Sequence, residues 1–271
     1  MTAQGAAAPG LRALDEVAAN ATVAPLTRLV DGWLAKAAPD LPFRRCNAVL
    51  PAVGAGTDPG GAVVTLAALE HWYGQLGQRV LIQVSSSDPA AASLDELLAE
   101  RGYAVEAPVE ILVGAAAEVS RGAGGPPPGV EVGVESPLDE AWAASYGRLH
   151  GGGEVDQRRT EGYGRMLAGL GSGALAASAR QDGRVVGVGF GVVERGWLGV
   201  FGMATAEAER RRGVAVAVLG ALTRVAAGWG WGAERVYLQV EEGNAAARAL
   251  YARAGFTPSH RYHYRVSAPP P

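Results

Sequence analysis

The sequence contains a single cysteine, Cys46, and a single lysine, Lys36, in 271 residues. One cysteine excludes a disulfide framework and a metal site built on thiolates, and nothing else in the sequence points to a bound metal. Cysteine this scarce fits a reducing compartment, so we expect a cytoplasmic protein. Cys46 could act as a nucleophile, but no histidine is visibly paired with it, and we interpret it as a small buried residue.

The chain also lacks a surplus of positive charge and any long hydrophobic run. Its formal net charge is -3 at pH 7, and it has no uninterrupted apolar stretch of about 18 residues. Residues 1–10 do not have the pattern of a signal peptide. We therefore expect neither nucleic acid nor a membrane as a partner, and a monomer or homodimer. With 48% hydrophobic residues, the chain is long enough for one large domain or two modest ones.

A proline-rich break divides the chain. The segment 121–129 reads RGAGGPPPG, and three consecutive prolines cannot continue a helix or a central strand. We interpret it as a linker between an N-terminal domain, residues 1–122, and a C-terminal domain, residues 130–268. Residues 1–20 and the last four residues are expected to be frayed.

The second half has the pattern of an α/β domain with a mixed sheet. Asp182-Gly183 is typical of a two-residue hairpin turn. A meander followed by strand–helix units predicts a mixed sheet with helices on both faces. The expected strands are 130–135, 174–180, 185–193, 197–204, 235–240 and 262–266, and the expected helices are 137–149, 154–170, 214–228 and 244–254. In the first half we expect helices at 26–37, 63–76 and 93–101, and strands at 46–53, 79–85 and 103–113.

The segment 209–215 (ERRRGVA) lies between an expected strand and an expected helix. The first turn of a helix has unpaired backbone N–H groups and a partial positive charge, so it attracts phosphate. Gly213 and Ala215 lack bulk and would let a diphosphate approach the backbone. An ordinary helix start with a solvated arginine cluster is the alternative, but three arginines there oppose the helix dipole unless an anion is bound. The segment therefore predicts a cofactor with a diphosphate.

Two motifs in this half resemble those of the GNAT superfamily of N-acetyltransferases. Arg210, Gly213 and Ala215 match the acetyl-CoA motif R/Q-x-x-G-x-G/A, and residues 244–256 resemble N-x-x-A-x-x-L-Y-x-x-x-G-F. The resemblance covers about half of the chain. It implies a GNAT fold, acyltransferase activity and acetyl-CoA as the donor. The implied cofactor contacts are Met203, Ala204, Thr205, Arg210, Arg211, Arg212, Gly213, Val214, Ala215, Asn244, Ala247 and Tyr251.

The resemblance also implies catalytic roles. Tyr251 would be the general acid, because a phenol with a pKa near 10 can protonate a leaving thiolate; the alternative is that it packs beside Leu250. Backbone amides of Met203 and Thr205 would stabilise the oxyanion. Asn244 is also a good N-cap, and Gly255 fits the C′ position with positive φ.

The general base and the substrate are less well defined. Strand 197–204 has no carboxylate, so the base candidates are Glu161, Glu194, Glu241, His150 or a chain of waters. Residues 145–153 form a glycine-rich break that we interpret as a mobile lid. Aromatic residues expected around an amine substrate, or else in the core, are Trp142, Tyr146, His150, Tyr163, Trp197, Tyr262 and Tyr264, with Glu194 beside them.

We therefore expect acetyl transfer to the primary amine of a small molecule, such as an amino acid or an antibiotic, by direct attack in a ternary complex. A non-catalytic acetyl-CoA sensor and a protein N-acetyltransferase are the alternatives. Turnover would exclude the sensor, whereas a protein substrate would need an open groove.

The first half repeats the second in a degenerate form. Residues 79–84 (RVLIQV) match residues 235–240 (RVYLQV) at four of six positions, and Leu97–Tyr103 parallels Leu250–Phe256. Leu98 replaces the tyrosine, and residues 54–59 replace the arginine loop with a segment whose Asp58 would repel phosphate. We predict a tandem GNAT-like fold with an intact C-terminal copy and a partial N-terminal copy acting as a scaffold. Coincidental similarity between α/β units is the alternative.

The arrangement also resembles actinobacterial two-part GNAT proteins whose N-terminal part begins with an Arg-Asn strand like Arg45-Cys46-Asn47.

Overall fold

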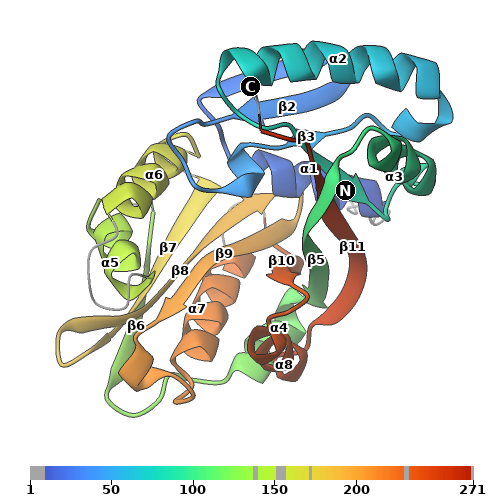
Figure 1. Ribbon diagram of the computed structural model, residues 1–271. Helices are drawn as coiled ribbons and strands as arrows, with labels where there is room; N and C mark the ends of the chain where they lie inside the picture. The colour runs from blue at the N-terminus through green and yellow to red at the C-terminus, as the bar shows by residue number, and fades with distance from the viewer. Residues whose placement is uncertain (1–9, 137–139, 151–156, 171–172, 229–231, 270–271) are drawn as a thin grey trace, which may run out of the picture.

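The computed structural model describes residues 10–136, 140–150, 157–170, 173–228 and 232–269. Its strands are β1 Leu26–Val30, β2 Trp33–Ala37, β3 Val49–Leu50, β4 Leu81–Ser85, β5 Ala104–Ala115, β6 Val130–Glu135, β7 Ala174–Gln181, β8 Arg184–Glu194, β9 Trp197–Thr205, β10 Arg235–Glu241 and β11 Thr257–Val266. Its helices are α1 Leu11–Asn20, α2 Pro59–Gln75, α3 Ala91–Glu100, α4 Ala116–Ala123, α5 Glu140–His150, α6 Gln157–Ala168, α7 Val214–Gly228 and α8 Ala245–Arg253 (Figure 1). Each helix that the structure describes is too short or too polar to span a lipid bilayer.

All the strands form one mixed sheet in the order β1-β2-β3-β4-β11-β5-β10-β9-β8-β7-β6. The last strand, β11, lies between β4 and β5, and β5 of the first half lies between β11 and β10 (Figure 1). Each half of the sequence thus gives one strand to the other half of the sheet. The expected division, between residues 122 and 130, falls at the connection between α4 and β6. The two halves interlock in the sheet, however, and the division into separate domains remains a prediction.

The sheet has an internal two-fold pattern centred between β5 and β11. Strands β3 and β4 pair in parallel as β9 and β10 do, and β4 and β10 each pair antiparallel with the strand that the other half supplies. The sequence offset of 153 residues that relates Leu97 to Leu250 also relates Val109 to Tyr262, and these two residues are partners across β5 and β11. The fold is therefore the tandem arrangement that the sequence repeat predicts.

Residues 26–37 form a hairpin, so the expectation of a helix there was wrong. Strands β1 and β2 pair antiparallel around Asp31-Gly32, whose φ values are 48° and 80°. Asp182-Gly183 joins β7 and β8 in the same way, with φ values of 49° and 76°. An Asp-Gly pair with both φ values positive matches the twist of a two-residue hairpin, and this local signal outweighs the apolar periodicity of the segment.

The expectation that residues 1–20 are frayed was also wrong for the described part, because α1 begins at Leu11. Its buried Asp15 accepts hydrogen bonds from Ser85 (2.7 Å) and Ser87, and lies 3.1 Å from His260. This polar cluster, with the buried Leu14, fixes α1 on the sheet. Residues 1–9 lie outside the described part.

Several element bounds also differ from expectation. The strand expected at 46–53 is reduced to β3, since Arg44–Cys46 form a 3-10 turn and Gly54 has a φ of 74°. Helix α4 was not expected and includes the first residues of the linker. Residues 137–139 and 154–156, expected to begin α5 and α6, lie outside the described residues.

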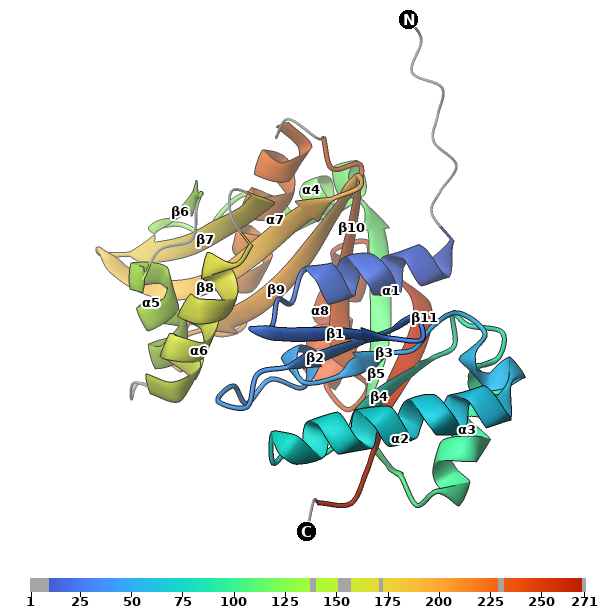
Figure 2. The ribbon, with the colours of Figure 1, turned by 90° about the horizontal axis from the view of Figure 1, so that it is seen from above.

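The helices cover both faces of the sheet, as expected. One shared core joins α1, α5 and α6 to strands of both halves. On the other face, α4, α7 and α8 pack on the C-terminal half and α2 and α3 on the N-terminal half. Figure 2 shows α7 and the α5–α6 pair on opposite sides of β7–β9, and α1 and α2 on opposite sides of β1–β3. The α1–α5–α6 face, where both halves meet, and the α7–α8 face are the two sides from which a site in this sheet can be reached.

Lys36 is buried in the shared core and closes the end of α1. Its ammonium donates to the carbonyl oxygens of Ala19 (2.9 Å) and Thr22 (3.0 Å) and to the Thr22 hydroxyl (3.0 Å). Burial lowers the pKa of Lys36 from 10.5 to about 8; the neighbouring Cys46 opposes the shift and Arg45 adds to it. The charged form satisfies the carbonyls at the helix end, but its desolvation is costly.

This shift makes stability depend on pH. Between pH 8 and about 10, the unfolded lysine still binds the proton that the folded lysine has lost, so the free energy of unfolding should rise with pH by about 1–2 kcal/mol. Urea unfolding at pH 7.5, 8.5 and 9.5 should show the rise in the wild type and a flatter profile in Lys36→Met. Parallel profiles would contradict a depressed pKa.

Candidate active site

Strands β9 and β10 separate in the middle of the sheet. Their parallel pairing runs from Trp197 and Arg235 to Val200 and Leu238, and within the described chain it goes no further. Beyond that point β9 continues against β8 as far as Thr205, and β10 continues against β5. The result is an opening in the sheet with the backbone of 201–205 along one side. Met203 and Thr205, the expected oxyanion donors, lie there with Ala204, an expected cofactor contact, and these roles remain predictions.

Gly202 is the second residue of this segment. Its φ is 58°, and an added Cβ would approach the Phe190 ring at 2.9 Å, so both the backbone conformation and the space favour glycine. The pairing of β8 with β9 shifts register at the same level. The irregularity turns the end of β9 away from β10.

The arginine loop leads from this opening into α7. Arg211 and Gly213 have φ values of 63° and 87°, so the chain reverses sharply before Val214 begins the helix. An added Cβ at Gly213 would meet no atom within 4 Å, and Arg210, Arg211 and Gly213 are exposed. The first turn of α7 is therefore open to an anion, which fits a diphosphate.

The three arginines are not equivalent. The Arg212 guanidinium donates to Glu209 at 2.8 Å, so its charge is already compensated. We therefore expect Arg210 to contribute more than Arg212 to any anion bound here.

Helix α8 has the caps that the sequence indicates. The Asn244 side chain accepts a hydrogen bond from the Ala247 amide (3.1 Å), and Gly255 ends the helix with a φ of 94°. Spacings of three and four residues place Asn244, Ala247 and Tyr251 along one side of the helix. Tyr251 is half-buried and edge-on to Phe256, and burial raises its pKa to about 12. The phenol thus keeps its proton at neutral pH, as a proton donor must.

A buried carboxylate from the N-terminal half anchors α8. Glu110 of β5 is 2% exposed and accepts from Arg248 of α8 (3.0 Å) and Arg261 of β11 (3.2 Å). Sequence patterns do not reveal this cluster, because the partners of Glu110 are more than a hundred residues away. It connects the helix that carries Tyr251 to the strand exchanged between the halves.

On the α1–α5–α6 face, a cavity of about 360 Å³ lies below the opening; we call it the acceptor cavity. Both halves of the chain line it. From the first half come Thr22, Pro42, Phe43, Arg44, Arg45, Cys46, Ala107 and Val109, and from the second Tyr146, His150, Met166, Phe190, Phe201, Gly202, Gln239, Glu241, Tyr262 and Tyr264. Four of the expected aromatic residues thus meet here: Tyr146, His150, Tyr262 and Tyr264.

Of the four base candidates, His150 and Glu241 line the acceptor cavity. Glu194 does not: it is the partner of Trp197 at the other end of β9 and accepts a hydrogen bond from Asn20 (2.8 Å). Nine residues of strand place that end roughly 25 Å from Thr205. Glu161 is exposed on α6 and accepts from Gln157 (2.9 Å).

Two further expected substrate residues lie elsewhere. Trp197 is buried edge-on to Tyr237, with the Arg235 guanidinium over its ring, and is part of the core. The side chain of Tyr163, on α6, lies outside the described residues. Residues 145–150 of the expected lid belong to α5, and residues 151–153 lie outside the described part.

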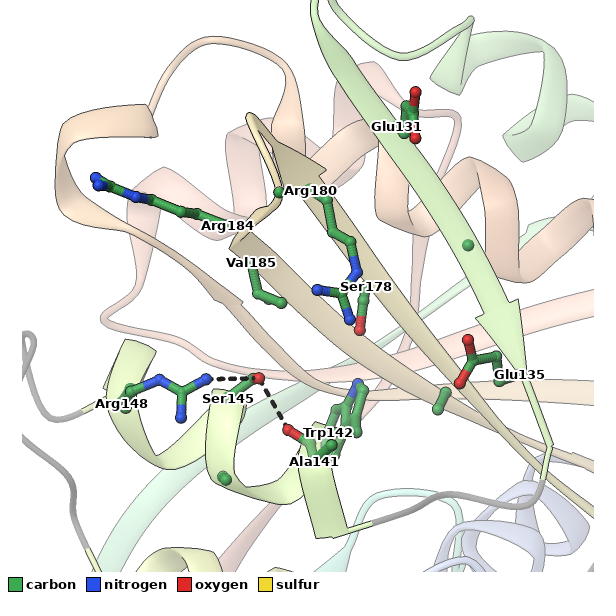
Figure 3. Close-up of a pocket in the computed structure, with 14 residues that line it drawn as sticks. Glu131, Glu135, Ala141, Trp142, Ser145, Arg148, Ser178, Arg180, Arg184 and Val185 are labelled. Carbon is green, nitrogen blue, oxygen red and sulfur yellow. Dashed lines mark hydrogen bonds between the residues drawn. The ribbon is translucent and has the colours of Figure 1, made fainter.

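Trp142 lines a second pocket and packs against two residues of the acceptor cavity. Its indole donates to the Ala177 carbonyl (3.0 Å), and its ring stacks on Tyr146 and meets Phe190 edge-on. The second pocket, of about 710 Å³, lies between α5 and β6–β8, with arginines on α5, β7 and β8 and two glutamates on β6 (Figure 3). Trp142 therefore supports the acceptor cavity through Tyr146 and Phe190.

Cys46 is buried beside Met166, with the two sulfur atoms 3.6 Å apart. Burial raises the pKa of its thiol, which disfavours the thiolate that a nucleophile needs.

In the N-terminal half, the region that corresponds to the arginine loop and the start of α7 is closed. Asp58 caps α2 by accepting from the Gly61 amide (3.1 Å), so a carboxylate stands where the C-terminal copy has an open helix start. Gly56 packs against the start of α3, where a Cβ would lie 2.4 Å from the Ala90 carbonyl oxygen. Leu98, at the position of Tyr251, is fully buried. These features agree with a scaffold role.

Comparison with known structures places this fold among the GCN5-related N-acetyltransferases. A protein of that description from Kribbella flavida covers 97% of this chain and 97% of its own, with a TM-score of 0.71 and 17% identity. A tandem GNAT protein from the clavulanic acid biosynthesis pathway covers 78% of this chain and 71% of its own, with a TM-score of 0.63 and 15% identity. The likeness establishes a tandem GNAT fold, a fold of acyltransferases.

The particular family follows from the sequence. Residues 9–265 match the family described as "Probable histone acetyltransferase Rv0428c C-terminal", and the chain belongs to that family. The uncharacterized N-acetyltransferase YobR of Bacillus subtilis is 39% identical over 71 residues. That match spans 26% of this chain and 28% of YobR.

Proposed function

We propose that this protein transfers the acetyl group of acetyl-CoA to the primary amine of a small molecule, in a ternary complex. The main support is the opening between β9 and β10, which has different surroundings on the two faces of the sheet. The exposed start of α7 and Tyr251 of α8 lie on one face, and the acceptor cavity lies on the other. Donor and acceptor could therefore meet through the sheet without a covalent enzyme intermediate.

The proposed chemistry assigns a task to each group. Acetyl-CoA supplies the acetyl group as a thioester. The α7 amides and Arg210 hold the diphosphate, and backbone amides in 203–205 stabilise charge on the carbonyl oxygen. The amine forms the C–N bond as the C–S bond breaks, Tyr251 protonates the leaving sulfur, and the proton lost by the ammonium goes to Glu241, His150 or solvent. The products are an N-acetyl amide and the free thiol.

The acceptor cavity favours a small molecule over a protein chain. Residues 42–46 of the first half form one of its walls, and the cavity volume of about 360 Å³ suits a metabolite. The family description names a histone acetyltransferase, so a protein acceptor is the competing proposal. To be acetylated, a lysine side chain of a protein acceptor would have to reach past this wall.

The test is release of free thiol from acetyl-CoA with a panel of amines and a histone-tail peptide. We expect turnover with small amines. Arg210→Gln should raise KM for acetyl-CoA about tenfold, whereas the matched Arg212→Gln should change it less than about threefold, because Glu209 already pairs with Arg212. Turnover confined to the peptide would contradict the small-molecule acceptor. Tight acetyl-CoA binding without any turnover would indicate a sensor.

A further inference from the structure

Arg45, from the first half of the chain, reaches the place where the two central strands separate. Its guanidinium carbon lies 5.8 Å from the centre of the Phe201 ring, and Phe201 is the first residue of β9 beyond the parallel pairing. Arg45 is half-buried and lines the acceptor cavity with Gly202. The N-terminal half therefore places a cation beside the proposed reaction centre.

The backbone around Arg45 is fixed by Asn47. The Asn47 side chain accepts from the Ala38 amide (2.7 Å) and donates to the carbonyl oxygens of Leu41 and Phe43, both at 3.0 Å. Gln78 donates to the same Asn47 oxygen (2.7 Å). These bonds brace the backbone on both sides of Arg45, in the wall of the cavity.

Several cationic side chains gather in this part of the acceptor cavity. Arg44 and Arg45 both line it, and Lys36 and Arg45 together line a smaller hollow next to it. The charge of Arg45 contributes to lowering the pKa of Lys36 and opposes the burial that raises the pKa of Tyr262 and Tyr264. Arg44 is already paired with two carboxylates, those of Glu106 and the 67% exposed Glu241, each at 3.7 Å, and His150 also lines the cavity.

We infer that the acceptor is an amine that also carries a carboxylate, and that Arg45 binds this carboxylate. The inference rests on the proposed acetyl transfer and narrows its substrate to amino acids and related amino carboxylates. A half-buried guanidinium in an aromatic cavity is a favourable site for a carboxylate, because water competes weakly there. A carboxylate on Arg45 leaves the amine of the same small molecule on the side of Gln239 and Glu241, where β10 diverges from β9.

The test compares matched acceptors, amino acids against their carboxamides, beginning with L-phenylalanine and L-phenylalaninamide because Phe43, Tyr146 and Phe201 line the cavity. The wild type should favour the acids. Arg45→Gln should lower kcat/KM for the acids by about 30–100-fold and for the carboxamides by less than about threefold. For each acceptor, the loss is the ratio of kcat/KM in the wild type to kcat/KM in the variant. The difference in amine pKa between acid and carboxamide cancels from this ratio, because both enzymes act on the same acceptor.

The matched control is Arg28→Gln. Arg28 also lies over an aromatic ring, Trp72 at 5.3 Å, but it is exposed on β1 and does not line the acceptor cavity. Arg28→Gln should leave kcat/KM unchanged for both the acids and the carboxamides. The wild-type preference tests the inference even if Arg45→Gln folds poorly.

Transfer to neutral amines as fast as to the acids, or an equal loss on both in Arg45→Gln, would overturn the role of Arg45 and leave the acetyltransferase proposal standing. No transfer to any amine would overturn both.

Discussion

Replacing Tyr251 with phenylalanine should lower kcat for acetyl transfer by about 10²–10³-fold and change KM for acetyl-CoA by less than about threefold. The ring contact with Phe256 would remain, and only the hydroxyl that donates the proton would be lost. Because burial raises the pKa of this phenol to about 12, the wild-type rate should not fall between pH 8 and 9.5 through loss of the acid.

Steady-state kinetics with the best amine of the panel gives both constants. The matched control is Tyr103→Phe, which removes a hydroxyl bonded to Glu70 (2.8 Å) in the N-terminal half and should leave kcat unchanged. An unchanged rate in Tyr251→Phe would remove Tyr251 from the acid role.

Replacing Glu110 with alanine should lower the free energy of unfolding by about 2–3 kcal/mol, because two charge-assisted hydrogen bonds to a buried carboxylate are lost. The change leaves the guanidinium groups of Arg248 and Arg261 without the buried carboxylate between them. Because Glu110 belongs to the exchanged strand β5, the loss should loosen α8 and also lower kcat.

Urea unfolding followed by circular dichroism measures the effect. Glu106→Ala, on the same strand, removes a partly exposed carboxylate that pairs with Arg44 (3.7 Å) and Arg79 (3.1 Å), and it should cost less than about 1 kcal/mol. Equal losses of unfolding free energy in Glu110→Ala and Glu106→Ala would contradict a special role of the buried cluster in joining the two halves.

Local signals explain what the sequence predicts well. The arginine loop and the Asn244–Phe256 segment each depend on a few neighbouring residues, and the caps at Asn244 and Gly255 are where those residues indicate. The repeat was visible because short matches recur at nearly constant offsets. The repeat also includes a hairpin turn, since Asp31-Gly32 stands in the first half where Asp182-Gly183 stands in the second.

Long-range pairing explains what the sequence could not predict. The exchange of β5 and β11 depends on contacts between residues about 150 positions apart, as between Val109 and Tyr262. The wall of the acceptor cavity at Arg45 follows from that exchange. Trp197 and Glu194 have suitable residue types, but the point where β9 leaves β10 is set by strand register, which composition does not reveal.

A crystal structure with CoA and an amino carboxylate tests the central claim most directly. We predict the diphosphate on the amides of 211–215, the sulfur between the 203–205 segment and Tyr251, and the carboxylate on Arg45 across the sheet, with one CoA per chain. CoA bound at Gly54–Pro59 of the N-terminal half, or both ligands on one face of the sheet, would contradict the account.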